Sequence, residues 1–175
     1  MIRFFRIAAF SIIFIFIITN QVFAQSSYVL PYPSSMPGGF AYKLHLVYEK
    51  ISKYWYFGSL GQFEYNLKMA DKYLVEAKTL FDYKQYLLGV KSLEKSSSYF
   101  NQTLPSLRKS EAEGKSVSQK RIILSEAALK HIEYLEEIDF DTPDVFIWEP
   151  EKSSPISLPL KKILINAINI RKDNQ

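Results

Sequence analysis

The sequence has no cysteine and only two histidines among its 175 residues. Without cysteine the chain can form no disulfide framework, no thiolate metal site and no cysteine nucleophile. The two histidines, His45 and His131, form neither a His-x₃-His nor a His-Glu-x₂-His motif, so they could share a metal only if their helices were neighbours. We therefore expect boundary or surface histidines, no metal site and no cofactor.

A strong charge of one sign is also absent, because 22 Lys and Arg face 18 Asp and Glu. Two of the basic residues, Arg3 and Arg6, belong to an N-terminal segment that we expect to be removed, which leaves 20 against 18. Nucleic-acid binding depends on a concentrated basic face that neutralises phosphates. This balance predicts that nucleic acid is not a partner.

The N-terminus carries one long hydrophobic run, residues 7–18 (IAAFSIIFIFII). It follows the two arginines and precedes Val22-Phe23-Ala24, which is the order of a secretory signal peptide cleaved between Ala24 and Gln25. A membrane-spanning helix needs ~20 apolar residues, and polar residues end this run early. Residues 1–24 are therefore predicted to be a signal peptide, and the mature chain to be secreted or to lie in the cell envelope. A retained segment would instead anchor the chain and be its membrane contact.

Residues 25–39 contain three prolines, two glycines and four serines. This composition predicts an extended lead-in, because proline fixes φ and disfavours helix in the residue before it. Tyr28, Val29, Leu30 and Tyr32 could dock on the domain as a hydrophobic strap. Without that docking, the lead-in would be a flexible tether.

From Phe40 onward the apolar residues recur at helical spacing. A first helix is predicted from Phe40 to about Phe57. Its buried face is expected to consist of the residues at steps of three and four: Leu44, Val47, Tyr48, Ile51 and Trp55. Glu49 and Lys53 are an acid-then-base pair four residues apart and are expected on a solvated face.

Three further helices are predicted. Residues 59–81 carry an unbroken apolar stripe, and residues 83–104 repeat it up to Pro105, which marks the end of this helix or the start of a kink. Residues 105–116 are polar and predict a loop or a frayed connection. A last helix runs from 116 to 138. Facing stripes of this kind are typical of left-handed bundles. The predicted fold class is all-α: an antiparallel helical bundle of about four helices over residues 40–138, with a long central helical hairpin.

Residues 139–175 differ in composition from the bundle. Eight acids and no base lie between 133 and 151, and prolines interrupt any long helix. The alternating carboxylates of 139–144 resemble the start of a calcium loop, but Asp144 stands where that loop needs glycine. A solvated acidic loop is predicted, with a weak calcium site as the alternative. A short C-terminal amphipathic helix should follow over 160–168, although ILINAINI could also form a strand.

Carboxylate catalysis needs neither cysteine nor histidine, so a helical cell-wall glycosidase has to be considered. Glu76 is the acid most closely flanked by the stripe of the second helix. We expect it to pair with Lys72 or with a backbone group. The sequence therefore predicts no catalytic residue and a protein that is not an enzyme.

Twelve tyrosines and two tryptophans could form a stacking surface for sugars or peptides. Tyr56, Tyr65 and Tyr73 lie off the apolar stripes and are the candidates for an aromatic binding surface. Off-stripe tyrosines can equally cover a second helix contact. Packing is the favoured interpretation, and an exposed surface is the alternative.

Several segments resemble a known family. They are Leu30-Pro31, the turn at Pro37, Tyr42-Lys43 and the run Ala70-Asp71-Lys72-Tyr73-Leu74-Val75-Glu76-Ala77. Over about residues 28–104 the chain resembles domain-of-unknown-function family 5667, a helical domain of exported bacterial and archaeal proteins. Lys72 matches the family pattern, whereas Tyr73 stands where arginine is usual. The resemblance implies a signal-led helical domain and brings no activity, ligand or catalytic residue with it.

Together these observations predict an exported, non-catalytic helical module that binds a protein partner at the cell envelope. One alternative is an envelope glycan-binding domain that uses exposed tyrosines with Trp55 or Trp148. The other is a membrane-anchored stalk domain, if the signal is retained.

Overall fold

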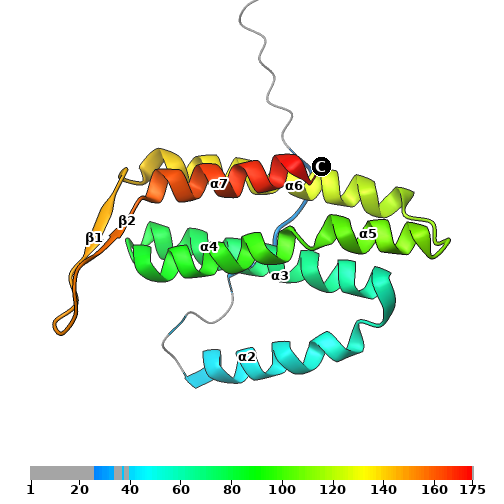
Figure 1. Cartoon of the computed structure of the whole chain (residues 1–175), viewed down its shortest axis with the longest axis horizontal. Helices are drawn as coiled ribbons and strands as arrows, with labels where there is room; N and C mark the ends of the chain where they lie inside the picture. Colours follow the sequence, from blue (N-terminus) through cyan, green and yellow to red (C-terminus); the bar gives the residue numbers. More distant parts are fainter. Residues whose placement is uncertain (1–25, 34–36, 38–39, 175) are drawn as a thin grey trace, which may run out of the picture.

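The computed structural model describes residues 26–33, 37 and 40–174. The predicted signal peptide and its cleavage site at Ala24 and Gln25 lie outside the described residues. The elements are α2 (Phe40–Ser52), the 3-10 helix η1 (Lys53–Trp55), α3 (Gly58–Asp82), α4 (Tyr86–Phe100), α5 (Thr103–Ala112), α6 (Ser118–Asp141), β1 (Phe146–Trp148), β2 (Ile156–Leu158) and α7 (Leu160–Asp173). Long helices packed on one another confirm the all-α prediction (Figure 1). In this part of the chain, every helix is too short or too polar to cross a membrane.

The predicted long central hairpin consists of α3 followed by α4 and α5. The turn between α3 and α4 contains Lys84 with a φ of 58°, so α4 begins at Tyr86 and leaves Tyr83, a predicted stripe residue, 72% exposed. Residues 105–112 were predicted as loop and are instead most of α5. Pro105 lies in the first turn of that helix, where a backbone N–H is not needed for helical hydrogen bonds.

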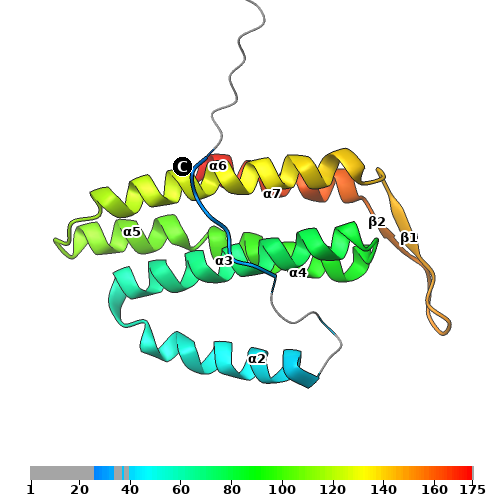
Figure 2. The same ribbon diagram turned by 180° about the vertical axis from the view of Figure 1, so that it is seen from behind.

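The bundle continues past residue 138, where the sequence placed its end. α6 and α7 lie side by side and cover α3, α4 and α5 from one side (Figure 1 and Figure 2). Leu160, Leu164 and Ala167 of α7 are at most 2% exposed. The predicted C-terminal helix is therefore part of the core, and the strand alternative for ILINAINI is wrong.

The core divides into two apolar clusters along the bundle axis. One contains residues from the C-terminal half of α3 with α4, α6 and α7, including Leu74, Leu93, Leu135 and Leu164. The other contains residues from the N-terminal half of α3 with α5 and α6, such as Phe63. A layer of polar side chains separates the two clusters.

The first predicted helix forms, but its predicted buried face is wrong. Tyr42, Glu49 and Ser52 are buried, whereas the five predicted core residues are between 51% and 61% exposed: Leu44, Val47, Tyr48, Ile51 and Trp55. The physical reason is that α2 is held on α3 by hydrogen bonds and an ion pair, so its polar side faces the bundle. The helix also ends at Ser52, short of the predicted Phe57.

The acidic segment after α6 leads into a two-stranded antiparallel hairpin that the sequence did not predict. Phe146 pairs with Leu158 at its base, and Trp148 pairs with Ile156 near its tip. The ring of Phe146 packs on Tyr86 with a centroid distance of 5.0 Å. The hairpin thus attaches to the bundle at one end and stands off it at the other (Figure 1).

Residues 26–33 dock on the bundle and form a strap, one of the two arrangements that the sequence left open. Tyr28 and Leu30 pack against the core clusters, whereas Val29 and Tyr32 are 84% and 96% exposed. Open grooves of about 620 and about 530 Å³ flank the strap.

Candidate functional site

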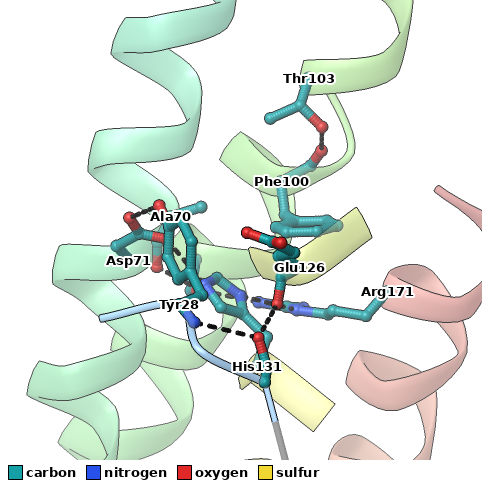
Figure 3. A network of polar contacts seen from close by, with 10 residues as sticks. Tyr28, Ala70, Asp71, Phe100, Thr103, Glu126, His131 and Arg171 are labelled. Atoms are coloured by element: carbon teal, nitrogen blue, oxygen red, sulfur yellow. Dashed lines mark hydrogen bonds and ion pairs between the residues drawn. The ribbon is translucent and has the colours of Figure 1, made fainter. Parts of the chain in front are cut away.

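The polar layer between the two clusters is built from Asp71 of α3, His131 of α6 and Arg171 of α7 (Figure 3). Asp71 Oδ1 lies 2.8 Å from His131 Nε2, and Arg171 Nε donates to His131 Nδ1 at 3.5 Å. The phenol of Tyr28 in the strap donates to Asp71 Oδ2 at 2.7 Å. His131 and Arg171 are both 0% exposed.

The terminal nitrogens of the Arg171 guanidinium bond to α4 and to α7 itself, where Nη1 donates to the carbonyl oxygen of Ala167 at 3.2 Å. The two terminal nitrogens also donate to Ser97 Oγ at 2.6 Å and to Ser96 Oγ at 2.7 Å. Ser96 in turn donates to the carbonyl oxygen of Ala70 at 2.7 Å. The ring of Phe100 covers the layer, with its centroid 5.1 Å from the guanidinium carbon.

These contacts assign protonation states across the layer. Because Arg171 Nε can only donate, His131 Nδ1 accepts, and the ring proton belongs on Nε2 beside Asp71. Burial lowers the pKa of His131; the hydrogen bond to Asp71 raises it, and the charge of Arg171 lowers it again, with a net lowering. Burial lowers the pKa of Arg171 to about 9, against the charge of Asp71. At neutral pH the layer is thus a neutral imidazole between a carboxylate and a guanidinium.

This arrangement is suited to structure and not to catalysis. A histidine base needs one ring nitrogen within reach of a substrate, and both nitrogens of His131 are occupied inside the protein. Four helices and the strap each contribute to the layer, so a register shift of any of them would leave a buried charge without its partner. Leaving a buried donor or acceptor without its partner typically costs ~1–3 kcal/mol, and more for a charged group, which disfavours alternative packings of the helices.

A second polar network joins α2 to α3. Glu49 of α2 forms an ion pair with Lys72 and accepts from the Tyr73 phenol at 2.7 Å. Tyr42 donates to Glu76 Oε1 at 3.1 Å, and that oxygen also accepts from Ser92 Oγ of α4 at 2.7 Å. The expected pairing of Glu76 with Lys72 is therefore wrong, because Glu49 occupies Lys72. Glu49 likewise pairs with Lys72 and not with Lys53.

The aromatic surface predicted from Tyr56, Tyr65 and Tyr73 does not form as an exposed platform. Tyr65 and Tyr73 are 2% and 3% exposed because residues of α2 and α4 pack on them, and Tyr56 is partly buried against Tyr65. Tyr99 stacks on Tyr73 at 5.9 Å between centroids and meets Tyr65 edge-on at 6.0 Å. Burial is the first cause that raises the pKa of Tyr65 and of Tyr73. These tyrosines therefore pack at a second helix contact, which was the favoured interpretation of the sequence.

The remaining candidates are dispersed. His45 is exposed on α2, whereas His131 is buried in the polar layer. Asp139 forms an ion pair with Lys161 at 3.2 Å and belongs to α6, so it does not open a calcium loop. Among the described residues, no group of three or more His, Asp or Glu side chains is placed to hold a metal ion.

The polar layer was missed at the sequence level, although two of its members continue apolar stripes. His131 lies in register with Leu124, Ala128, Leu135 and Ile138, and Arg171 lies four residues after Ala167. A polar residue at a stripe position signals a buried polar contact. Asp71 lies beside the stripe of α3 and carries no such signal.

No family model, curated protein or solved structure matches the chain. The candidate sites are therefore assigned from their own chemistry.

Proposed function

We propose that the chain is an exported, non-catalytic helical module that binds a protein partner at the cell envelope through the hairpin of β1 and β2. The observation that carries the proposal is the apolar surface of this projecting element. Val145, Ile147, Trp148 and Ile156 are between 36% and 58% exposed. Apolar side chains gathered on a projecting element are typical of a protein-binding site.

The negative charge around the hairpin indicates what kind of partner it can bind. Asp141, Asp144, Glu149 and Glu151 are exposed around its apolar residues, and Lys152 is the base among them. Such a surface repels anionic lipids and fits a protein whose binding site is apolar with basic residues at its rim.

Export and the absence of catalysis rest on other features. The order of arginines, apolar run and Val22-Phe23-Ala24 supports a signal peptide. The resemblance of residues 28–104 to domain-of-unknown-function family 5667 supports the proposal that the chain is an exported helical module. The polar networks described above hold their ionisable groups in mutual contacts, which favours binding over chemistry.

The test is a crosslinking pull-down from intact cells, with residues 25–175 as bait and a mass-spectrometric readout. We expect one envelope protein to be enriched by the wild-type bait and lost with Ile147→Asp. Ile165→Asp is the matched control, because Ile165 is 54% exposed on α7 and Ile147 is 58% exposed. Equal capture by both variants would refute binding through the hairpin.

The same experiment separates the alternatives. Trp55 and Trp148 are 61% and 36% exposed, so both remain available for a glycan. Enrichment of cell-wall fragments without any protein would favour the glycan-binding alternative. Secreted material that starts at Gln25 would exclude the membrane-anchored stalk.

A further inference from the structure

The outer face of α2 is apolar and faces away from the protein. Leu44, Val47, Tyr48 and Ile51 lie on one side of the helix and are between 51% and 57% exposed. Tyr42 and Glu49, which hold α2 on the bundle, lie on the opposite side. In both views α2 forms one edge of the molecule, on the side of α3 opposite α6 and α7 (Figure 1 and Figure 2). Ordinary surface helices turn their apolar side inward, so this orientation requires an explanation.

Aromatic side chains extend the face beyond the end of the helix. Trp55 is 61% exposed and meets Tyr48 edge-on at 6.0 Å between ring centroids. Tyr54 and Phe57 are 76% and 82% exposed. Tryptophan and tyrosine are enriched where a protein meets the boundary between lipid headgroups and acyl chains.

The charges around the face have one sign. Lys43, Lys50 and Lys53 are exposed, and Glu49, the acid of α2, is turned inward to Lys72. Two copies of α2 packed face to face would bring six lysines together without an acid from either helix. A negatively charged surface is therefore the better complement.

We infer that α2 is an in-plane anchor that docks on the surface of a bilayer containing anionic lipids. The helix would lie flat, with Leu44, Val47 and Ile51 among the upper acyl chains and the lysines at the phosphates. Lysines beside an apolar face with tryptophan, tyrosine and leucine characterise helices that bind in the membrane interface. Because α2 forms one edge of the molecule, its apolar face can meet a bilayer surface without obstruction by the other helices.

The polar attachment of α2 explains why this orientation is stable. Turning the apolar side inward would expose the phenols of Tyr42 and Tyr73 and break the pair of Glu49 with Lys72. These polar contacts therefore keep the apolar side of α2 turned away from the bundle. The anchor and the acidic hairpin occupy different parts of the molecule, so the two proposals can fail independently.

The test is co-sedimentation of residues 25–175 with vesicles. Both large core clusters lie within this segment, and each variant is first checked for cooperative thermal melting. We expect binding to vesicles of equal parts phosphatidylglycerol and phosphatidylcholine, with weaker binding to pure phosphatidylcholine. In a Trp148→Phe background, Trp55 fluorescence should shift to shorter wavelength on binding.

Three double variants identify the surface that binds the vesicles. Val47→Ser with Ile51→Ser should weaken vesicle binding by about tenfold or more, because each apolar side chain buried in the interface contributes to affinity. Ile122→Ser with Ile165→Ser is the matched control, since these side chains are 53% and 54% exposed on α6 and α7, and should bind within about twofold of wild type. Lys43→Gln with Lys50→Gln should abolish the preference for phosphatidylglycerol.

Three outcomes would overturn the inference. They are no binding to anionic vesicles, equal loss in the α2 variant and its control, or a dimer in solution that Val47→Ser with Ile51→Ser dissociates. The last would assign the face to a second copy. Ile147→Asp should leave vesicle binding unchanged, which keeps this test separate from the hairpin proposal.

Discussion

At the scale of single residues, the polar layer shows how three ionisable side chains can be buried together. Asp71 and Arg171 have opposite charges, and His131 joins them as a neutral ring that donates to one and accepts from the other. Tyr28, two serines and the Ala167 carbonyl supply further hydrogen bonds to Asp71 and Arg171. Because every member depends on its neighbours, a change of protonation at one position affects the whole layer.

His131 makes stability depend on pH. The pKa of His131 is lowered in the folded protein. Below the ordinary histidine pKa of about 6.5, His131 is therefore protonated in the unfolded chain while it stays neutral in the folded chain. The contribution of neutral His131 to the free energy of unfolding is fully present above the ordinary pKa, and it is lost as the pH falls toward the pKa of His131 in the folded protein. Thermal melts between pH 7.5 and 5.5, above the ordinary range of carboxylates, should therefore show a falling midpoint.

The other histidine supplies the control for this prediction. His131→Gln should melt lower than wild type at pH 7.5 and lose most of the pH dependence between 7.5 and 5.5. His45→Gln should keep both the stability and the pH dependence, because His45 is exposed on α2. A pH dependence that persists in His131→Gln would assign it to other groups.

At the scale of elements, helix positions were predicted better than helix partners. The stripe of α3 is buried as expected, from Phe63 to Phe81. The same spacing in α2 faces outward, because Tyr42 and Glu49 find partners on α3 that the pattern does not reveal. Glu64 and Lys68 are an acid and a base four residues apart, but Glu64 pairs with the more distant Lys120 of α6.

The hairpin of α3 and α4 depends on close packing at Gly89. A Cβ added there would lie 2.8 Å from Cδ2 of Phe81, a core side chain. We expect Gly89→Ala to lower the free energy of unfolding by up to ~2 kcal/mol, because overpacking (~1–3 kcal/mol) outweighs the ~1 kcal/mol that alanine contributes to a helix. Urea denaturation measures the change.

Ser98→Ala tests whether the destabilisation expected for Gly89→Ala comes from packing. Ser98 is exposed on the same helix, so this substitution should change stability by less than ~0.5 kcal/mol or raise it slightly. A stabilising Gly89→Ala would mean that α3 and α4 can separate without cost.

At the scale of the whole molecule, α7 completes a core that begins at the other end of the chain. Leu160, Leu164 and Ala167 pack with Leu74 of α3, and Arg171 reaches the layer that Tyr28 of the strap also enters. The fold is therefore one cooperative unit in which the strap, the central hairpin and the C-terminal helix depend on one another.

Deleting residues 160–175 should abolish cooperative unfolding. The deletion exposes the apolar cluster around Leu74 and leaves Asp71 and His131 without Arg171. Circular dichroism should show a broad thermal transition in place of a sharp one, with helical signal retained in part. A sharp transition in the truncated chain would show that α7 is dispensable.

A deletion in the hairpin is the matched control. Replacing residues 149–155 by Asn-Gly keeps the pairing of Trp148 with Ile156 and closes it with a two-residue turn. The removed residues are mostly exposed, so the thermal transition should remain sharp. Loss of the transition here would mean that the hairpin tip is part of the cooperative unit.

The all-α class, the central hairpin and the C-terminal helix could all be predicted from the amino-acid sequence. These features follow from the spacing of apolar residues, which is a local property and does not depend on which neighbouring helix each helix packs against. The sequence also determined what chemistry was absent, because a chain without cysteine cannot build thiolate sites. Residues 105–112 were predicted as a loop because they are polar, yet they belong to α5, and Pro105 lies in the first turn of that helix.

Which face of each helix is buried, and which polar groups meet, depends on the packing of the folded chain. Asp71, His131 and Arg171 lie 40 or more residues apart in sequence, so their contact depends on how α3, α6 and α7 pack. The same holds for the hydrogen bonds that bury Tyr65 and Tyr73 and turn the apolar side of α2 outward. A periodic pattern identifies an amphipathic helix, but the partner that covers its apolar side, another helix or a membrane, is set by contacts between distant residues.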